Sequence, residues 1–319
     1  MTTEHITAAG LYDDVPDAAY HADPLATPSL SSSIAKKIIA QSPRHAWFAH
    51  PKLNKALLDE VEKPTPAMDA GTAAHKVILG KGREIKEIVA DDFRTKAAQQ
   101  ARDEARAAGL LPILSHRMAG VHLQREAFFD QIQGTEVGDL FNEGAGEVTG
   151  VWQDLEDTWC RMRIDWLPAK SREGGHISLV DVKTTAGSAA PEDWQRNAFD
   201  MGYDTQDAFY QRGARELIKG ARSVTMYFVV LEQNPPYGLS VHRFGGQAYA
   251  EAEACIDMAV SLWSTCLAQD KWPGYQLETT HIDPPKWRSE RTKLRGMGMH
   301  RYVEIMNRPQ KRKAVEAAA

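Results

Sequence analysis

Hydrophobic and polar positions alternate along this chain with two different periods. The helical period covers residues 33–40, 44–49, 68–79, 95–108, 117–132, 203–219 and 248–268. Strand-like runs rich in Val, Ile and Trp cover residues 147–153, 158–167 and 177–184, and two more strands are predicted at 223–231 and 237–244. The short connection at 155–157 predicts an antiparallel hairpin of the first two strands. Strands framed by helices on both sides predict an α/β sandwich with a mixed sheet.

Prolines interrupt this pattern and suggest the domain boundaries. Pro16, Pro24 and Pro28 predict an extended N-terminal segment over residues 1–28. A second proline-rich stretch, 64–66, reads as a linker. The composition changes near 283–285, which places the main domain at residues 29–285 and a basic C-terminal tail at 286–319.

Composition indicates an ordinary globular chain. Its 319 residues, 43% hydrophobic and 25% charged, can bury a sizeable core. No apolar run is long enough to span a bilayer, and the N-terminus lacks the pattern of a secretory signal. The three cysteines form no CxxC pair, which argues against a cysteine-built zinc or iron–sulfur site. We expect a cytoplasmic protein without a membrane partner.

Charge is distributed unevenly along the chain. The segment 286–313 holds ten basic and two acidic residues, a charge of +8, so the remainder carries −13 within a net charge of −5. A basic segment on an acidic body suggests a polyanionic partner that is contacted locally. A disordered, solubilising tail is the alternative.

Residues 161–185, RMRIDWLPAKSREGGHISLVDVKTT, contain the most informative chemistry. Successive side chains of a strand alternate between faces, so Asp181 and Lys183 point one way and Val182 points into the core. With Asp165 they bring two carboxylates and an ammonium together. Hard divalent cations take such oxygen ligands, and a lysine beside the metal can orient a water for phosphodiester hydrolysis. Taken alone, an ordinary surface ion pair would look the same.

Two further features can supply metal ligands. In Gly71-Thr72-Ala73-Ala74-His75, the glycine allows close approach of the helix to the sheet, and His75 shares its face. Glu147 begins the strand that pairs with that of Asp165, although Glu143 is a local rival. The alternatives are a structural histidine and a solvated glutamate.

Two other features suit phosphate contacts. Gln206 and Tyr210 share a helix face, with Tyr203 close to it. Ser31, Ser33 and Arg44 lie near helix N-termini, which bind anions. Simple aromatic packing and ordinary helix capping are the alternatives.

In this order the motifs resemble those of the PD-(D/E)XK nuclease superfamily, in particular the RecE-like (exonuclease VIII) and RecB-type phage exonucleases. The resemblance runs from about residue 20 to 287. The segments that carry it are GTAAH at 71–75, EVTGVWQD at 147–154, CRMRIDWLP at 160–168, VDVKTT at 180–185 and YDTQDAFY at 203–210. It implies a restriction-endonuclease-like core with a mixed central β-sheet flanked by helices.

The resemblance also implies a function. Such enzymes degrade linear double-stranded DNA from 5′ to 3′, leave a 3′ single strand for an annealing protein, and form toroidal homo-oligomers. The implied roles are Mg²⁺ or Mn²⁺ binding by His75, Asp165, Asp181 and the Val182 carbonyl, assistance by Glu147, water positioning by Lys183, strand contacts by Tyr203, Gln206 and Tyr210, and 5′-end binding by Ser31, Ser33 and Arg44.

Other assignments remain open. An endonuclease of the same superfamily would also fit the motifs, as would a DNA-binding scaffold that has lost catalysis. A phage origin, and with it the cytosol of a bacterial host, is likewise implied only by the resemblance.

Overall fold

The computed structural model describes residues 5–54, 56 and 65–306. The chain divides into two compact units, residues 1–275 and 276–319. The strands of the first unit are β1 (Gly10–Tyr12), β2 (Leu30–Ser31), β3 (Ile85–Ile88), β4 (Leu111–Leu114), β5 (Gly144–Gln153), β6 (Trp159–Pro168), β7 (Gly175–Thr185), β8 (Ala221–Glu232) and β9 (Leu239–His242). Its helices are α1 (Asp17–His21), α2 (Ser32–Ala40), α3 (Pro43–Ala49), α4 (Pro66–Leu79), α5 (Lys96–Ala107), α6 (Ser115–Ile132), α7 (Glu136–Leu140), α8 (Pro191–Asp200), α9 (Tyr203–Leu217) and α10 (Gly246–Gln269).

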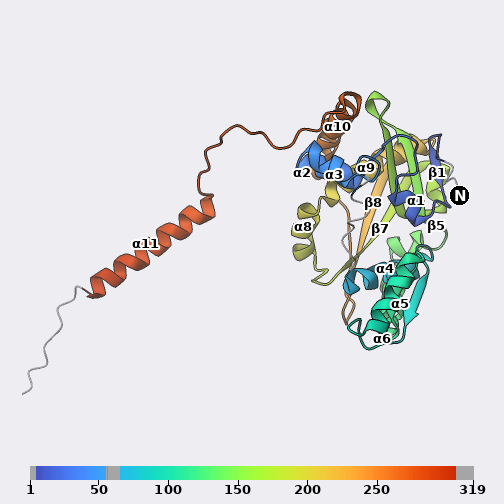
Figure 1. The fold of residues 1–319 in the computed structure, drawn as a ribbon, viewed down its shortest axis with the longest axis horizontal. Helices are drawn as coiled ribbons and strands as arrows, with labels where there is room; N and C mark the ends of the chain where they lie inside the picture. Colours follow the sequence, from blue (N-terminus) through green and yellow to red (C-terminus); the bar gives the residue numbers. More distant parts are fainter. Residues whose placement is uncertain (1–4, 55, 57–64, 307–319) are drawn as a thin grey trace, which may run out of the picture. The chain divides into compact units, whose positions relative to one another are not determined.

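A mixed sheet forms the centre of this unit (Figure 1). Its order is β1-β5-β6-β7-β8-β9, with β2 added alongside β6. Strands β7 and β8 are parallel, as are β2 and β6, whereas the remaining neighbours are antiparallel. The predicted hairpin of β5 and β6 is confirmed, and so is the predicted α/β class with a mixed central sheet.

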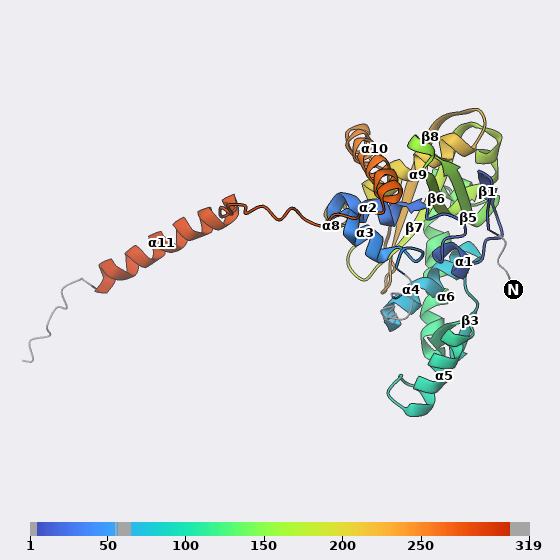
Figure 2. The same cartoon turned by 45° about the horizontal axis from the view of Figure 1, so that its top comes forward.

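The sheet packs against helices on both faces because its inner strands are apolar on both. In β7, Ile177 and Leu179 join the core formed with α2, α8, α9 and α10. Val180 and Val182 join the opposite core, formed with α4, α6 and α7. In both ribbon views α2, α3 and α10 group together, away from the group of α4, α5 and α6 (Figures 1 and 2).

Local sequence signals set the ends of the helices around the site. The Ser31 hydroxyl caps α2 by accepting from the Ile34 N–H, which is the ordinary helix capping that the sequence left open as the alternative to anion binding. Helix α4 follows a Thr65 cap and ends at Gly80, whose φ of 72° is the left-handed conformation that favours glycine.

Several elements differ from the sequence predictions. The N-terminal segment is not simply extended. Its strand β1 pairs with β5, and the segment also contains the helix α1. The pattern also missed α8. It missed the small parallel sheet of β3 and β4 because each of these strands is only four residues long. Part of the 64–66 linker and residues 307–319 lie outside the described residues.

The second unit contains one described helix, α11 (Lys286–Met306). The boundary predicted at residue 285 falls inside this unit rather than at its start. Among all residues that the structure describes, no helix is both long and apolar enough to cross a membrane.

Candidate active site

The candidate site lies where β6 and β7 separate. The two strands share only the Trp166–Val180 pair among the described residues. Beyond this pair, the Val182 N–H donates to the Asp165 carboxylate (N···Oδ2 2.8 Å) instead of pairing with the backbone of β6. The Val182 side chain is buried in the core of α4 and α6, as the alternation predicted. Asp181 and Lys183 therefore face α9.

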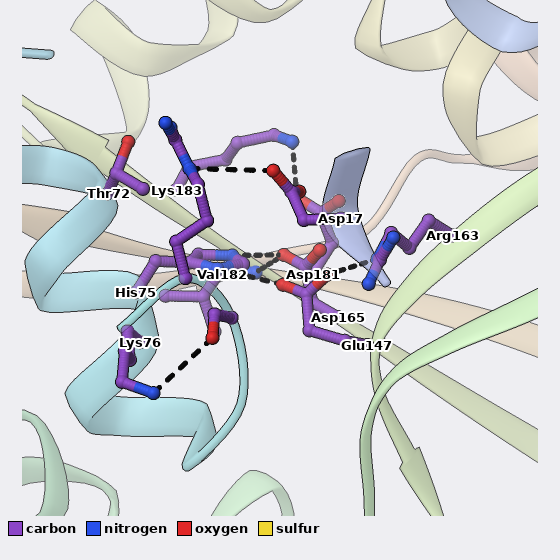
Figure 3. Close-up of polar contacts among 12 residues, drawn as sticks. Asp17, Thr72, His75, Lys76, Glu147, Arg163, Asp165, Asp181, Val182 and Lys183 are labelled. Carbon is purple, nitrogen blue, oxygen red and sulfur yellow. Dashed lines mark hydrogen bonds and ion pairs between the residues drawn. The ribbon is translucent and has the colours of Figure 1, made fainter. Parts of the chain in front are cut away.

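One group of side chains in this opening has the composition of a metal site. His75, Glu147 and Asp165 each place a ligand atom within 4.8 Å of the others. The His75 ring lies between the two carboxylates, with Nε2 2.8 Å from Asp165 and Nδ1 3.3 Å from Glu147 (Figure 3). Asp181 and the rival Glu143 are outside this group of side chains.

Helix α4 brings His75 into place by a close approach to β7. A Cβ atom on Gly71, one turn before His75, would lie 3.0 Å from the Thr184 hydroxyl. This contact is tighter than side chains normally make, so a glycine at this position lets α4 lie against the strand. The sequence prediction for Gly71 rested on the same reasoning.

Glu147 has an unusual backbone conformation. Its φ of 58° lies in the left-handed region, which costs a residue with a Cβ about 1–2 kcal/mol. Its carboxylate bridges the site: Oε1 faces His75, and Oε2 accepts a hydrogen bond from the Arg163 guanidinium. Such strain is commonly found at functional sites.

A second group lies beside the first. The Lys183 ammonium is 2.6 Å from the Asp181 carboxylate and donates to the Gln206 amide oxygen at 3.3 Å. The Gln206 amide donates to the other Asp181 oxygen at 2.6 Å. This network fixes the Lys183 ammonium at the surface of the opening.

The charges of the two groups are strongly interdependent. Burial disfavours a charged His75, but the Asp165 charge and hydrogen bonds to Asp165 and Glu147 outweigh it and raise its pKa to about 10. Burial and the Asp165 charge raise the pKa of Asp181 to about 6, against the effect of Lys183. Burial also disfavours charge on Lys183, but the two aspartates keep its pKa above the usual value. The first group thus stabilises a positive charge, and its donors fit a divalent cation.

These groups line a cleft of about 980 Å³. Among the predicted nucleic-acid contacts, Ser33, Gln206 and Tyr210 line it. Ser31 is instead a buried helix cap.

Tyr203 and Arg44 are outside the lining of the cleft. The Tyr203 ring stacks on Trp194 and Phe228, and Arg44 is exposed on α3.

Sequence reasoning missed three cations of the cleft, Lys36, Arg83 and Arg163. Arg163 is two positions before Asp165 on β6, a spacing that places it on the same side of a strand. Lys36 follows Ser32 and Ser33 by one helical turn. The spacing of Arg163 is visible in the sequence, whereas the position of Lys36 in the cleft depends on its packing against Gly202.

Residues 31–282 match the model of a family described as a PDDEXK-like domain of unknown function, DUF3799. The chain belongs to the DUF3799 family. This confirms the predicted membership of the PD-(D/E)XK nuclease superfamily. No curated protein matches this DUF3799 chain.

Two solved structures are similar to this DUF3799 member. A presumed exonuclease from Eubacterium rectale has a TM-score of 0.50 at 14% identity, over 81% of this chain and 90% of that chain. A phage-related exonuclease from Haemophilus somnus has a TM-score of 0.29 at 12% identity, over 76% of this chain and 96% of that chain. At 14% identity, the likeness to the first shows the fold alone.

Proposed function

We propose that this chain is a divalent-metal-dependent exonuclease that degrades linear double-stranded DNA from 5′ to 3′ and leaves a 3′ single strand for annealing. The observation that carries the proposal is the group His75, Glu147 and Asp165 beside the Asp181–Lys183 pair. A histidine and carboxylates next to a fixed lysine suit hydrolysis of a phosphodiester.

Each residue has a distinct role in this proposal. His75, Asp165 and Glu147 hold Mg²⁺ or Mn²⁺, with Asp181 and the Val182 carbonyl as further ligands. A metal ion held there would supply Lewis-acid chemistry, which activates a water and offsets charge on the scissile phosphate. Lys183 is protonated at neutral pH, since the nearby aspartates raise its pKa against the opposing effect of burial, and it therefore positions the water as a hydrogen-bond donor.

The side-chain amide of Gln206 and the phenol of Tyr210 support the catalytic groups. Gln206 orients Lys183 and Asp181 through hydrogen bonds to both. The Tyr210 hydroxyl accepts from the Arg163 N–H at 3.4 Å and supports β6 next to Asp165. The polarity of degradation, the annealing partner, the toroidal assembly and the cytoplasmic location follow from the resemblance in sequence and belong to the same proposal.

The test uses linear duplex DNA labelled at the 5′ or the 3′ end, beside a covalently closed circle. The wild-type protein, Lys183→Ala and the control Lys86→Ala are compared with Mg²⁺ and with EDTA. Lys86 is an exposed lysine on β3 and does not line the cleft. We expect release of nucleotides from 5′ ends only, with the circle intact, EDTA inhibitory and only Lys183→Ala inactive.

Two other results would redirect the assignment. Cleavage of the closed circle would identify an endonuclease. DNA binding without any release under all metal conditions would identify a binding scaffold.

A further inference from the structure

Lys36 lies in the catalytic cleft but has no place in the roles assigned above. It is on α2, one turn after Ser32 and Ser33, and lines the cleft with them. Its aliphatic stem packs on Gly202, where a Cβ atom would lie 2.8 Å from Lys36 Cδ. Its ammonium donates to the Met201 carbonyl at 3.3 Å. The side chain is therefore held along the junction of α8 and α9.

The Tyr203 ring connects Lys36 with the proposed catalytic lysine. The Lys36 ammonium lies 5.6 Å from the centroid of this ring, and the Lys183 ammonium lies 4.8 Å from it. Tyr203 is itself fixed by stacking on Trp194 and Phe228. The two cations are thus placed at defined positions around one rigid aromatic side chain.

The two lysines differ in how their charge is compensated. Lys183 has the Asp181 carboxylate at 2.6 Å. Among the described residues, no carboxylate oxygen lies within 4.0 Å of the Lys36 ammonium. Burial and the nearby Lys183 charge lower the pKa of Lys36 to about 8, and the charges of Asp181 and Asp204 oppose this shift only in part. A partly desolvated ammonium that faces an open cleft stabilises an anion placed there.

We infer that Lys36 binds a phosphate oxygen of the DNA strand in the cleft, as a second cationic contact beside Lys183. This inference rests on the proposed function, which makes DNA the occupant of the cleft. It gives Lys36 a role in phosphate binding that the sequence had suggested for the exposed Arg44. The contact is to the backbone and carries no base preference.

The test compares Lys36→Met with Lys37→Met. Methionine keeps the stem that packs on Gly202 and removes the charge, and Lys37 is the next residue on α2 but does not line the cleft. DNA binding is measured at several salt concentrations in the Lys183→Ala background, and cleavage is measured in the otherwise unchanged protein. Ends carrying a 5′-phosphate or a 5′-hydroxyl are used in parallel, so that a terminal phosphate is distinguished from an internal one.

We expect Lys36→Met to weaken DNA binding by about tenfold, the size expected for one charge-assisted hydrogen bond. The slope of log affinity against log salt should become less steep by about 0.9, which a purely structural defect would not cause. Lys37→Met should leave both unchanged, and Lys36→Arg should restore most of the affinity.

Failure of the inference can be told apart from failure of the proposed function. If the parent binds DNA and Lys36→Met behaves like Lys37→Met, Lys36 does not contact phosphate and the proposed function stands. If the Lys183→Ala protein does not bind DNA and the wild-type protein does not cleave it, the proposed function falls, and the inference falls with it.

Discussion

At the scale of single residues, the protonation of His75 determines how metal binding depends on pH. Burial opposes this proton, but Asp165 and Glu147 raise the pKa of His75 to about 10, so the ring is charged at neutral pH. A metal ion binds only the neutral ring. We therefore expect Mg²⁺ or Mn²⁺ binding at pH 7.5 to release about one proton per ion and to strengthen as the pH rises towards 10.

Calorimetric titration in two buffers of different ionisation enthalpy measures this release. His75→Gln is the matched control, because it keeps a polar side chain that carries no proton to lose. Identical enthalpies in the two buffers for the wild-type protein would contradict the prediction.

Asp207 provides a second residue-scale prediction, away from the metal group. It is 1% exposed on α9, and both its oxygens accept from the Gln211 amide. Burial raises its pKa to about 7, against the lowering effects of Gln211 and Arg215. Between the ordinary value of 3.8 and 7, the unfolded chain has lost this proton while the folded chain retains it, so rising pH destabilises the fold.

Asp207→Asn removes this cost and keeps an oxygen that accepts from Gln211. The melting temperature of the variant should exceed that of the wild-type protein at pH 8, by about 2–4 °C for each kcal/mol. The difference should shrink towards pH 4.5. Thermal unfolding at pH 4.5, 6 and 8 measures it, and a difference that does not change with pH would show that Asp207 is not the cause.

At the scale of elements, the β5 backbone is strained where it delivers Glu147 to the site. Glu147→Gly and Glu147→Ala both remove the carboxylate, but only glycine adopts the φ of 58° without a Cβ penalty. We expect both variants to lose metal affinity, and Glu147→Gly to be more stable than Glu147→Ala by about 1 kcal/mol. Chemical denaturation and metal titration of the pair test this; equal stability would mean that the strand relaxes to an ordinary conformation.

The sequence predicted elements whose signal lies within one segment. Strands β5 to β8 and helices α2, α4 and α9 were visible because periodicity and caps such as Ser31 are local. It also predicted that Asp181 and Lys183 share a face, since alternation follows from strand geometry.

The features that the sequence did not predict depend on contacts between segments that are distant along the chain. The Lys36 side chain reaches the cleft by packing on Gly202, which is 166 positions away in sequence. The split of β6 from β7 is likewise a tertiary feature, because no property of either strand alone requires it. Local patterns carry no information about either arrangement.

At the scale of the whole molecule, charge is separated between the two units. Helix α11 carries six of the ten basic residues of segment 286–313 against two glutamates. It lies beyond residues 31–282, which the family model matches. A nuclease with an acidic body gains electrostatic attraction for DNA from such a helix.

We therefore expect neutralisation of α11 to weaken DNA binding at low salt and to matter little at high salt. The variant replaces Lys286, Arg288, Arg291, Lys293, Arg295 and Arg301 with glutamine. The matched control replaces six exposed basic residues of the first unit, Lys86, Arg94, Lys96, Arg117, Lys170 and Lys219.

For every phosphate group that α11 neutralises in the wild-type complex, the variant should show a slope of log affinity against log salt that is less steep by about 0.9. The control variant has the same net charge as the α11 variant. If its slope equals that of the wild-type protein, the location of the charges on α11, and not the total charge, determines the salt dependence of DNA binding. If both variants behave alike, α11 does not bind DNA, and its basic and apolar side chains fit the docking of a protein partner instead.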